Sequence, residues 1–369
     1  MTNIEAGREG RIRELDGWRG VSILLVVLHH ALLYAFPAAG ASSTKLEHVV
    51  SYAGDFGVRI FFVVSGFVIT RLLILEERKF GSISLKGFYT RRLFRIVPVF
   101  YCYLLTVSIL SWLGWTPVSN GGDLAAGLFL YDVRRLFNLH DWFVGHSWSL
   151  AVEEQFYITF PFFWMLSSRR IRTAVLLGTL AIFLAAGVLA EWGLAGNLFS
   201  HAAIVGFSCI NVGALAAIFE GRVLRLASKP SSAAVFSIFL VLLVHPVSNS
   251  KIGESLYCLV VPFGIALVLM HTVARQGWLS SFLKLPAVQW CGLISYSAYL
   301  WQELFTGSTN VYGGPVAGRV FHLLLLLLPL IAAGSFYWIE RPCTRFGRKL
   351  TMRVRAREAM DASRETAAT

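Results

Sequence analysis

Residues 15–34 read LDGWRGVSILLVVLHHALLY, and they decide what kind of protein this chain can be. Most of the stretch is apolar, yet it carries Arg19 and the adjacent pair His29 and His30. A membrane-spanning helix needs about 20 mostly apolar residues. A charged side chain inside such a helix costs at least about 2.5–3.5 kcal/mol at mid-depth, so it normally faces a cavity or a partner. The stretch therefore predicts a membrane helix with a polar, potentially functional face.

The composition of the whole chain agrees with a membrane protein. Of its 369 residues, 56% are hydrophobic and only 15% are charged, and the mean hydropathy is +0.63. A soluble domain has roughly 45–50% apolar and about 25% charged residues. The balance excludes an ordinary cytosolic enzyme and a disordered chain. It also argues against nucleic-acid binding despite a net charge of +12. The five cysteines form no C-x-x-C pair, so we expect neither a disulfide framework nor a metal site.

Hydropathy predicts an all-α integral membrane protein with about ten transmembrane helices. The N-terminal residues mix acidic and basic side chains, and no small-residue cleavage site follows the first apolar run. We therefore expect that run to stay as a membrane anchor rather than to be removed as a signal peptide. The ten apolar segments are 20–37, 58–75, 93–113, 146–166, 171–190, 201–219, 233–249, 255–274, 288–306 and 316–339.

The distribution of basic residues predicts the orientation. With the N-terminus in the cytoplasm, 27 of the 33 Lys and Arg residues fall on the cytoplasmic side, as the positive-inside rule requires. Both termini are then cytoplasmic. The chain divides into a cytoplasmic tail over 1–14, a transmembrane domain over 15–342 and a basic tail over 343–369. We expect the basic tail to end disordered.

The first helix places two polar residues on one face. Arg19 and His30 are eleven residues apart, which at 100° per residue is three turns plus about 20° and an axial distance of roughly 16 Å. An arginine at the cytoplasmic mouth suits phosphate, and a deeper histidine suits proton transfer. His29 lies about 100° round the helix and is the weaker candidate. The alternatives are a topogenic arginine and a structural histidine.

Two further segments carry candidate site residues. Residues 146–160, HSWSLAVEEQFYITF, hold two adjacent carboxylates, of which at most one can aim at His30; a structural ion pair is the alternative. Residues 86–100, KGFYTRRLFRIVPVF, hold arginines one turn apart that could clamp phosphate or serve only topology and anionic lipid. The candidates in these segments are Glu153, Glu154, Tyr157, Arg92 and Arg95.

Ser65 and Gly66 lie in the apolar segment IFFVVSGFVIT. Small residues at this position let two helices approach closely, so packing is the default interpretation. No Gly-x-Ser-x-Gly elbow surrounds Ser65, which argues against a nucleophilic serine.

Four of these motifs, in this order, resemble the membrane-bound acyltransferase-3 family, multispan proteins that O-acylate sugars and related acceptors. The matching stretches are LDGWRG…HH with an arginine, ten residues and a histidine, then GVRIFFVVSGFVIT, RRLFRIVP and HSWSLAVEEQFY. SYSAYLWQELF and a closing ERP add weaker support. The resemblance covers about residues 15–342.

The resemblance implies an acyl-CoA donor, usually acetyl-CoA, reached from the cytoplasm. It also implies a hydroxyl of a lipopolysaccharide, exopolysaccharide or similar glycan as the acceptor, in a bacterial inner membrane and without a metal. His30 would be a general base or a transient acyl carrier. The residues carried over are Arg19 and His30 as the essential pair, Glu153 and Glu154 beside them, Arg92 and Arg95 for the donor, and Ser65, Tyr157 and Asp55 as support.

Two positions depart from the family pattern. Arg59 stands where many members have Asp, with Asp55 as a nearby substitute, and Gln302 stands where many have His. We also see no appended extracytoplasmic hydrolase-like domain, so we expect the membrane part to finish the transfer or to hand it to a separate protein.

Two other classes of protein fit the same residues. A transporter or exporter could use the intramembrane charges as a relay, although the sequence shows no pair of broken helices in two repeated halves. A lipid-binding sensor without catalysis is the third possibility.

Overall fold

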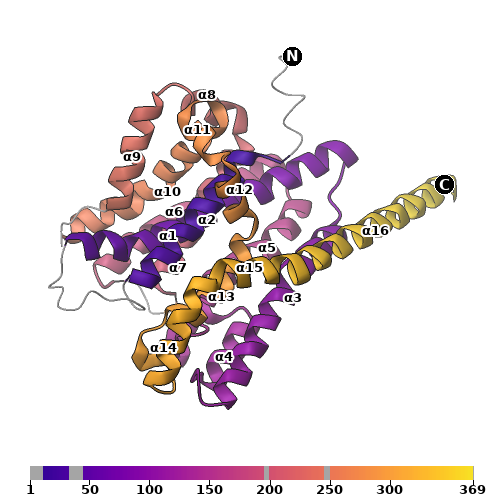
Figure 1. Cartoon of the computed structure of the whole chain (residues 1–369). Coiled ribbons are helices and arrows are strands. Elements are labelled where there is room, and N and C mark those ends of the chain that lie inside the picture. Colours follow the sequence, from indigo (N-terminus) through magenta and orange to yellow (C-terminus); the bar gives the residue numbers. More distant parts are fainter. Residues whose placement is uncertain (1–10, 33–44, 195–198, 245–249, 369) are drawn as a thin grey trace.

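The computed structural model describes residues 11–32, 45–194, 199–244 and 250–368, and within these ranges every regular element is a helix (Figure 1). This confirms the all-α class for the described residues. The longer helices are α1 Arg13–His30, α2 Lys45–Phe80, α3 Leu85–Trp112, α5 Ser147–Leu166, α6 Arg169–Glu191, α7 His201–Ile218, α9 Ser232–Val244, α10 Lys251–Ala274, α13 Ser295–Thr306 and α16 Arg341–Ala368. The shorter elements are α4 Asn120–Gly127, η2 Tyr131–Phe137, α8 Glu220–Ala227, α11 Trp278–Leu283, α12 Pro286–Leu293, η3 Thr309–Val311, α14 Pro315–Leu324, η4 Leu325–Leu327, α15 Leu328–Ser335 and η5 Phe336–Glu340.

Helices overlap all ten predicted segments, but fewer of them qualify as membrane spans by length and composition. Six do so among the described residues: Tyr52–Phe80, Leu85–Trp112, Arg169–Glu191, His201–Ile218, Lys251–Ala274 and Val316–Arg355. The pair α8 and α9, bent by 101°, makes a seventh if it is counted as one span. Three predicted spans, at α1, α5 and α12–α13, are neither among the six nor part of this pair. Ten spans and their orientation therefore stay a prediction, and its parts at 33–37 and 245–249 lie outside the described residues.

The C-terminal segment differs from its prediction. Composition predicts that residues 343–369 end disordered, whereas α16 is one helix to Ala368. Two causes explain it. The segment is rich in Ala, Arg, Glu and Met, which favour helix, and its first half packs on α3, where Thr351 Oγ1 donates to the Gly87 carbonyl at 3.3 Å. Arg355 of α16 still pairs with Glu76 of α2, and beyond Arg355 the helix extends away from the bundle (Figure 1).

Helices α2 and α7 pack side by side and touch through two glycines. An added Cβ on Gly66 of α2 would collide with the carbonyl oxygen of Ile210, and one on Gly213 of α7 with that of Val63. Small residues allow such backbone contact between membrane helices. The packing interpretation of Gly66 is thereby confirmed, and the contact fixes α2, which lines the site described below.

Glycines also seat α1 against α12. A Cβ on Gly20 would meet the Val288 carbonyl oxygen, and one on Gly292 would meet that of Asp16. At its N-terminal end α1 is held by Glu14, whose carboxylate lies 2.8 Å from Lys284 Nζ. These contacts orient the helix that carries Arg19 and His30.

Replacing Gly213 by Ala should destabilise the protein, because the new methyl group would push apart two backbones in contact. Overpacking of this kind costs about 1–3 kcal/mol. Gly178 of α6 is the matched control, since a Cβ there meets nothing within 4 Å. In a helix interior Gly178→Ala should be neutral or stabilising by up to about 1 kcal/mol. Thermal unfolding of the two variants in detergent measures the difference, and equal changes would contradict the packing argument.

Candidate functional site

Three cavities follow one another along α1. The basic cavity, of about 850 Å³, lies at the end where α1 and α16 begin. The histidine cavity, of about 300 Å³, lies at the other end of α1. Between them is the central cavity, of about 80 Å³, which shares Arg19, Val64, Val68 and Arg95 with the basic cavity and Val58 and Tyr299 with the histidine cavity.

The basic cavity concentrates guanidinium groups. Seven arginines line it against two acids, Asp16 and Glu340. The side chains of Arg19 and Arg95 make no ion pair within the described part of the chain, so their charge is available to an anion. Guanidinium groups bind phosphate through paired hydrogen bonds. The lining arginines are Arg11, Arg19, Arg71, Arg95, Arg341, Arg345 and Arg348.

Sequence reasoning missed the three arginines that α16 contributes to this cavity. Arg341, Arg345 and Arg348 line it together. Their spacing of four and three residues places them on one face of a helix. That spacing is present in the ERPCTRFGRK stretch. The residues after this stretch are polar, however, and their composition favours a disordered tail over a helix.

Arg92 lies elsewhere than predicted. Its guanidinium sits over the Tyr157 ring, 4.2 Å from the centroid, and it lines the central cavity but not the basic one. Arg19 and Arg95, by contrast, line both. Of the three arginines expected to hold the donor's phosphates, two therefore reach the basic cavity.

The central cavity also holds one of the two predicted carboxylates. Ser65 Oγ donates a hydrogen bond of 2.6 Å to Glu153 Oε1, and both residues line the cavity. Glu154 is not among the lining residues, and its Oε1 is buried without a hydrogen-bond partner in the described structure. Adjacent residues thus point different ways, as the helical geometry predicts.

Both histidines of α1 line the histidine cavity. His30 Nδ1 is 3.0 Å from the Val26 carbonyl oxygen, and His29 Nδ1 is 2.8 Å from that of Val50. A carbonyl only accepts, so each Nδ1 is the protonated nitrogen and each Nε2 is the basic one in the neutral ring. The expectation that His29 points away from the site is therefore wrong. It shares the cavity because α2 brings Val50 and Gly54 against it.

A buried histidine–carboxylate pair that the sequence does not predict lines the same cavity. His146 Nδ1 lies 2.6 Å from Glu303 Oε2, and the two side chains are only 2% and 6% exposed. The same oxygen accepts the backbone N–H of His146 at 3.2 Å, just before α5 begins. The positive end of the α5 dipole also favours a carboxylate here. Trp142 Nε1 completes the arrangement by donating to the Glu303 carbonyl at 3.0 Å.

Three carboxylates line the cavity with His30, namely Asp55, Asp141 and Glu303, and of these Glu303 is the buried one that pairs with a histidine. Neither Glu153 nor Glu154 lines the histidine cavity, so the expectation that one of them orients His30 is wrong. The sequence did contain a signal, because Glu303 is an acidic residue in the apolar motif SYSAYLWQELF. Its partner could not be read there, since 157 residues separate it from His146.

The remaining candidates occupy supporting or peripheral places. Asp55 is exposed at the rim of the histidine cavity, whereas Arg59 is buried with its guanidinium 5.3 Å from the centre of the Tyr257 ring. Gln302 is fully buried, and its Nε2 has no partner in the described structure. In the segment before α5, burial raises the pKa of Asp132 above its ordinary value.

Together the fold and the cavities define a helical membrane protein with a polar interior that runs from arginines to histidines. A family model for an acyltransferase domain matches residues 12–339, and the chain belongs to this family, the acyltransferase-3 family that the motifs resemble.

The chain is also similar to longer bacterial proteins. It is 24% identical to the peptidoglycan O-acetyltransferase OatA of Listeria monocytogenes over 91% of this chain and 56% of that protein. It is 26% identical to YrhL of Bacillus subtilis, provisionally named a peptidoglycan O-acetyltransferase, over 92% of this chain and 56% of YrhL. A Staphylococcus aureus protein provisionally named an O-acetyltransferase is 25% identical over 91% of this chain and 58% of its own length. The chain thus spans little more than half the length of these relatives. No solved structure matches it.

Removing the buried carboxylate should destabilise the protein. Glu303→Ala removes the carboxylate that lies 2.6 Å from His146 Nδ1 and accepts the His146 backbone N–H, and breaking a buried pair in this way costs about 3–5 kcal/mol. Glu303→Gln keeps an acceptor and should cost less. Asp55→Ala, an exposed acid on the same cavity, should change stability by no more than about 0.5 kcal/mol. Thermal unfolding in detergent ranks the three, and a Glu303→Ala variant as stable as Asp55→Ala would contradict the assigned pair.

Proposed function

We propose that this protein is an integral-membrane O-acyltransferase that moves an acyl group, most simply acetyl, from acyl-CoA to a hydroxyl of a carbohydrate-containing acceptor. The observation that carries the proposal is the series of three cavities with arginines at one end and histidines at the other. A donor with phosphates needs the arginines, and an acceptor hydroxyl needs a histidine base. The reaction also requires that the two environments be connected. Membership of the acyltransferase domain family supports the reaction class.

The basic cavity would bind the phosphates of acyl-CoA. Arg19 and Arg95 stand where it meets the central cavity, and the arginines of α16 form its outer wall. We place this end in the cytoplasm, where acyl-CoA is made, because 27 of the 33 basic residues fall on that side of the predicted topology. Arg92 lines the central cavity and would not contact the phosphates.

The histidine cavity would hold the reacting groups. In the proposed step, His30 Nε2 takes the proton of the acceptor hydroxyl, and the hydroxyl oxygen attacks the carbonyl carbon of the thioester. The acyl–oxygen ester forms, the carbon–sulfur bond breaks, and CoA leaves as the thiol after accepting that proton from His30. Glu303, held by His146, faces the same cavity and would stabilise the protonated His30.

The acceptor would enter from the far side of the membrane. Polar side chains there suit a carbohydrate, since Arg134, His140 and Asp141 line the histidine cavity from the 114–145 segment. The relatives named above point to a cell-wall glycan such as peptidoglycan, although they are nearly twice as long as this chain. Lipopolysaccharide and exopolysaccharide present the same chemistry, and mass spectrometry of envelope glycans with and without the gene would identify the acceptor.

Labelled acetyl-CoA tests the donor site and its side of the membrane. Inside-out membrane vesicles should incorporate label into glycan from added acetyl-CoA, and right-side-out vesicles should not, because acetyl-CoA does not cross the membrane. Arg95→Ala or Arg348→Ala should weaken acetyl-CoA binding by about 1.5–3 kcal/mol for each charge-assisted hydrogen bond that the substitution removes.

Two controls make this test specific. Arg222→Ala removes an exposed arginine that does not line the basic cavity, and it should bind acetyl-CoA normally. Dephospho-CoA donors should lose less affinity in the Arg95 and Arg348 variants than acetyl-CoA does. Equal losses of affinity for both donors would mean that these arginines set the orientation in the membrane and do not bind the phosphates. Transport of solute by liposomes without any acyl transfer would favour a transporter instead.

The roles of the histidines separate by kinetics. His30→Ala should reduce transfer by about 10²–10⁴-fold, the usual worth of a general base, while acetyl-CoA still binds. His29→Ala should lose less, because the His29 ring packs against α2 and its basic nitrogen is not the proposed base. Both variants are compared with wild type at matched membrane expression, with donor binding measured separately. If His29→Ala were inactive and His30→Ala active, His29 rather than His30 would be the general base. If both variants were active, neither histidine would act as the base.

A further inference from the structure

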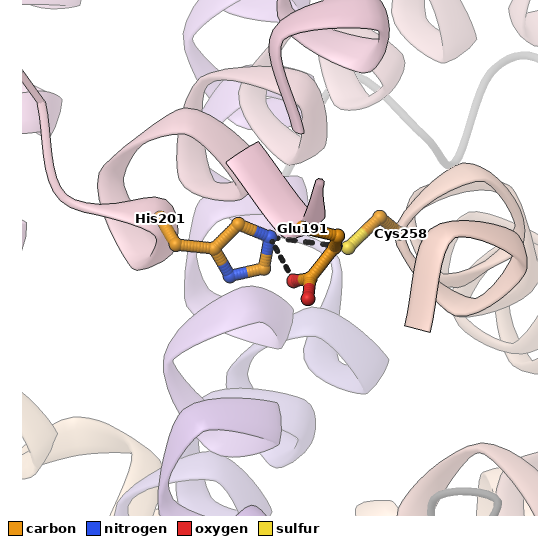
Figure 2. A group of neighbouring side chains, drawn as sticks. All are labelled: Glu191, His201 and Cys258. Atoms are coloured by element: carbon orange, nitrogen blue, oxygen red, sulfur yellow. Dashed lines mark hydrogen bonds and ion pairs between the residues drawn. The ribbon is translucent and has the colours of Figure 1, made fainter. Parts of the chain in front are cut away.

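A cluster of three metal-ligand side chains lies apart from the three cavities. Glu191 is the last residue of α6, His201 is the first residue of α7, and Cys258 lies in the third turn of α10. Figure 2 shows the imidazole pointing toward both the carboxylate and the thiol. His201 Nε2 is 2.9 Å from Glu191 Oε1 and 3.3 Å from Cys258 Sγ, and the three ligand atoms lie within 4.8 Å of one another.

The packing of the helices brings this cluster together. Gly187 is one turn before Glu191 on α6 and lies beside Cys258, where a Cβ added to the glycine would be in ordinary van der Waals contact with the Cys258 Cβ at 3.9 Å. Cys258 is buried, whereas the His201 and Glu191 side chains are 31% and 21% exposed. An ion could therefore enter from the helix ends and meet the thiol on the inner side of the site.

We propose that Glu191, His201 and Cys258 bind a zinc ion. One imidazole nitrogen, one thiolate and one carboxylate oxygen are the three kinds of ligand that Zn²⁺ uses in proteins. Tetrahedral zinc with bonds of about 2.0–2.3 Å needs neighbouring ligand atoms roughly 3.3–3.6 Å apart. The observed separations from His201 Nε2 differ from that range by a few tenths of an ångström at most, and the Glu191 and Cys258 ligand atoms lie within 4.8 Å of each other. Side-chain movements of about an ångström would therefore close the site. Water would complete the fourth position.

Charge balance fits a divalent cation. The Glu191 carboxylate and the Cys258 thiolate would neutralise Zn²⁺, with the thiol proton released on binding. Arg59 is a nearby cation, buried beside Tyr257, and Asp55 one turn before it on α2 offsets its charge. The neutral site thus adds little net charge to this part of the bundle.

The ion would act as a cross-link between helices. It would join α6, α7 and α10 at one end, and α7 is the helix that holds α2 through Gly213. None of the three ligands lines the cavities of the proposed acyl transfer, so the site is structural and independent of that proposal. Cys258 lies 57 residues after His201, which is why no short cysteine motif predicts the site.

The test is metal analysis of the full-length protein, purified in detergent with its affinity tag removed. Wild type should retain about one zinc per chain after dialysis, and the chelated protein should bind Co²⁺ with the near-ultraviolet absorption of a cobalt–thiolate bond. Chelation should lower the midpoint of thermal unfolding. Cys258→Ser and Glu191→Gln should each lose zinc, and in Cys258→Ser the cobalt–thiolate band should be absent.

The control variant is Cys102→Ser, which removes a half-buried thiol on α3 and should keep both the zinc and the band. Gel filtration shows whether each variant is folded. The zinc and cobalt measurements on wild type test the proposal even if a variant fails to fold. Wild type without zinc and without a cobalt–thiolate band would overturn the proposal and leave an ion pair with a thiol beside it. A band that persists in Cys258→Ser, or disappears in Cys102→Ser, would overturn the assigned ligands.

Discussion

The cost of placing a polar or ionised side chain inside an apolar helix bundle governs this structure. Such a group needs a partner or a polar cavity, and α1 presents one near each of its ends. Arg19 opens onto two cavities, and His30 onto a third. Both positions depend on how α1 packs against α12. The glycines at this contact allow the two helix backbones to approach each other closely. Cavity positions and helix packing are thus parts of one arrangement.

Local sequence predicts the helices of this protein better than the number of membrane crossings. Continuous apolar runs such as those in α3, α6 and α10 are found by hydropathy and are long enough to span a bilayer. The polar interruptions that make α1 and α5 interesting for function also lower their hydropathy, so composition alone cannot count them. Helix α16 escapes prediction for a different reason. Its order depends on packing against α3, a contact between segments far apart in the chain.

The site was predictable to the extent that helical periodicity determines it. The eleven-residue spacing predicts one face for Arg19 and His30, and in the structure the two line neighbouring cavities rather than a single one. The adjacency of Glu153 and Glu154 separates their directions, as helical geometry predicts. A buried carboxylate in a sequence does not show which histidine it meets, however. Glu153 pairs with Ser65, and the histidine cavity receives Glu303 from α13 instead. Periodicity acts within one helix, whereas partners are chosen by the packing of different helices.

The size of the central cavity bears on how the proposed reaction keeps its two substrates apart. Its volume of about 80 Å³ has room for only a few water molecules, and Phe61, Phe62 and Tyr299 are among its lining residues. A hydrated nucleotide with its phosphates is far too large for it, whereas a thin unbranched chain that carries a thioester is not. The arginines would hold the phosphates at one end while the thioester reaches the histidines at the other. The narrowness of this passage, rather than charge alone, would then let the acyl group through and retain the rest of the donor.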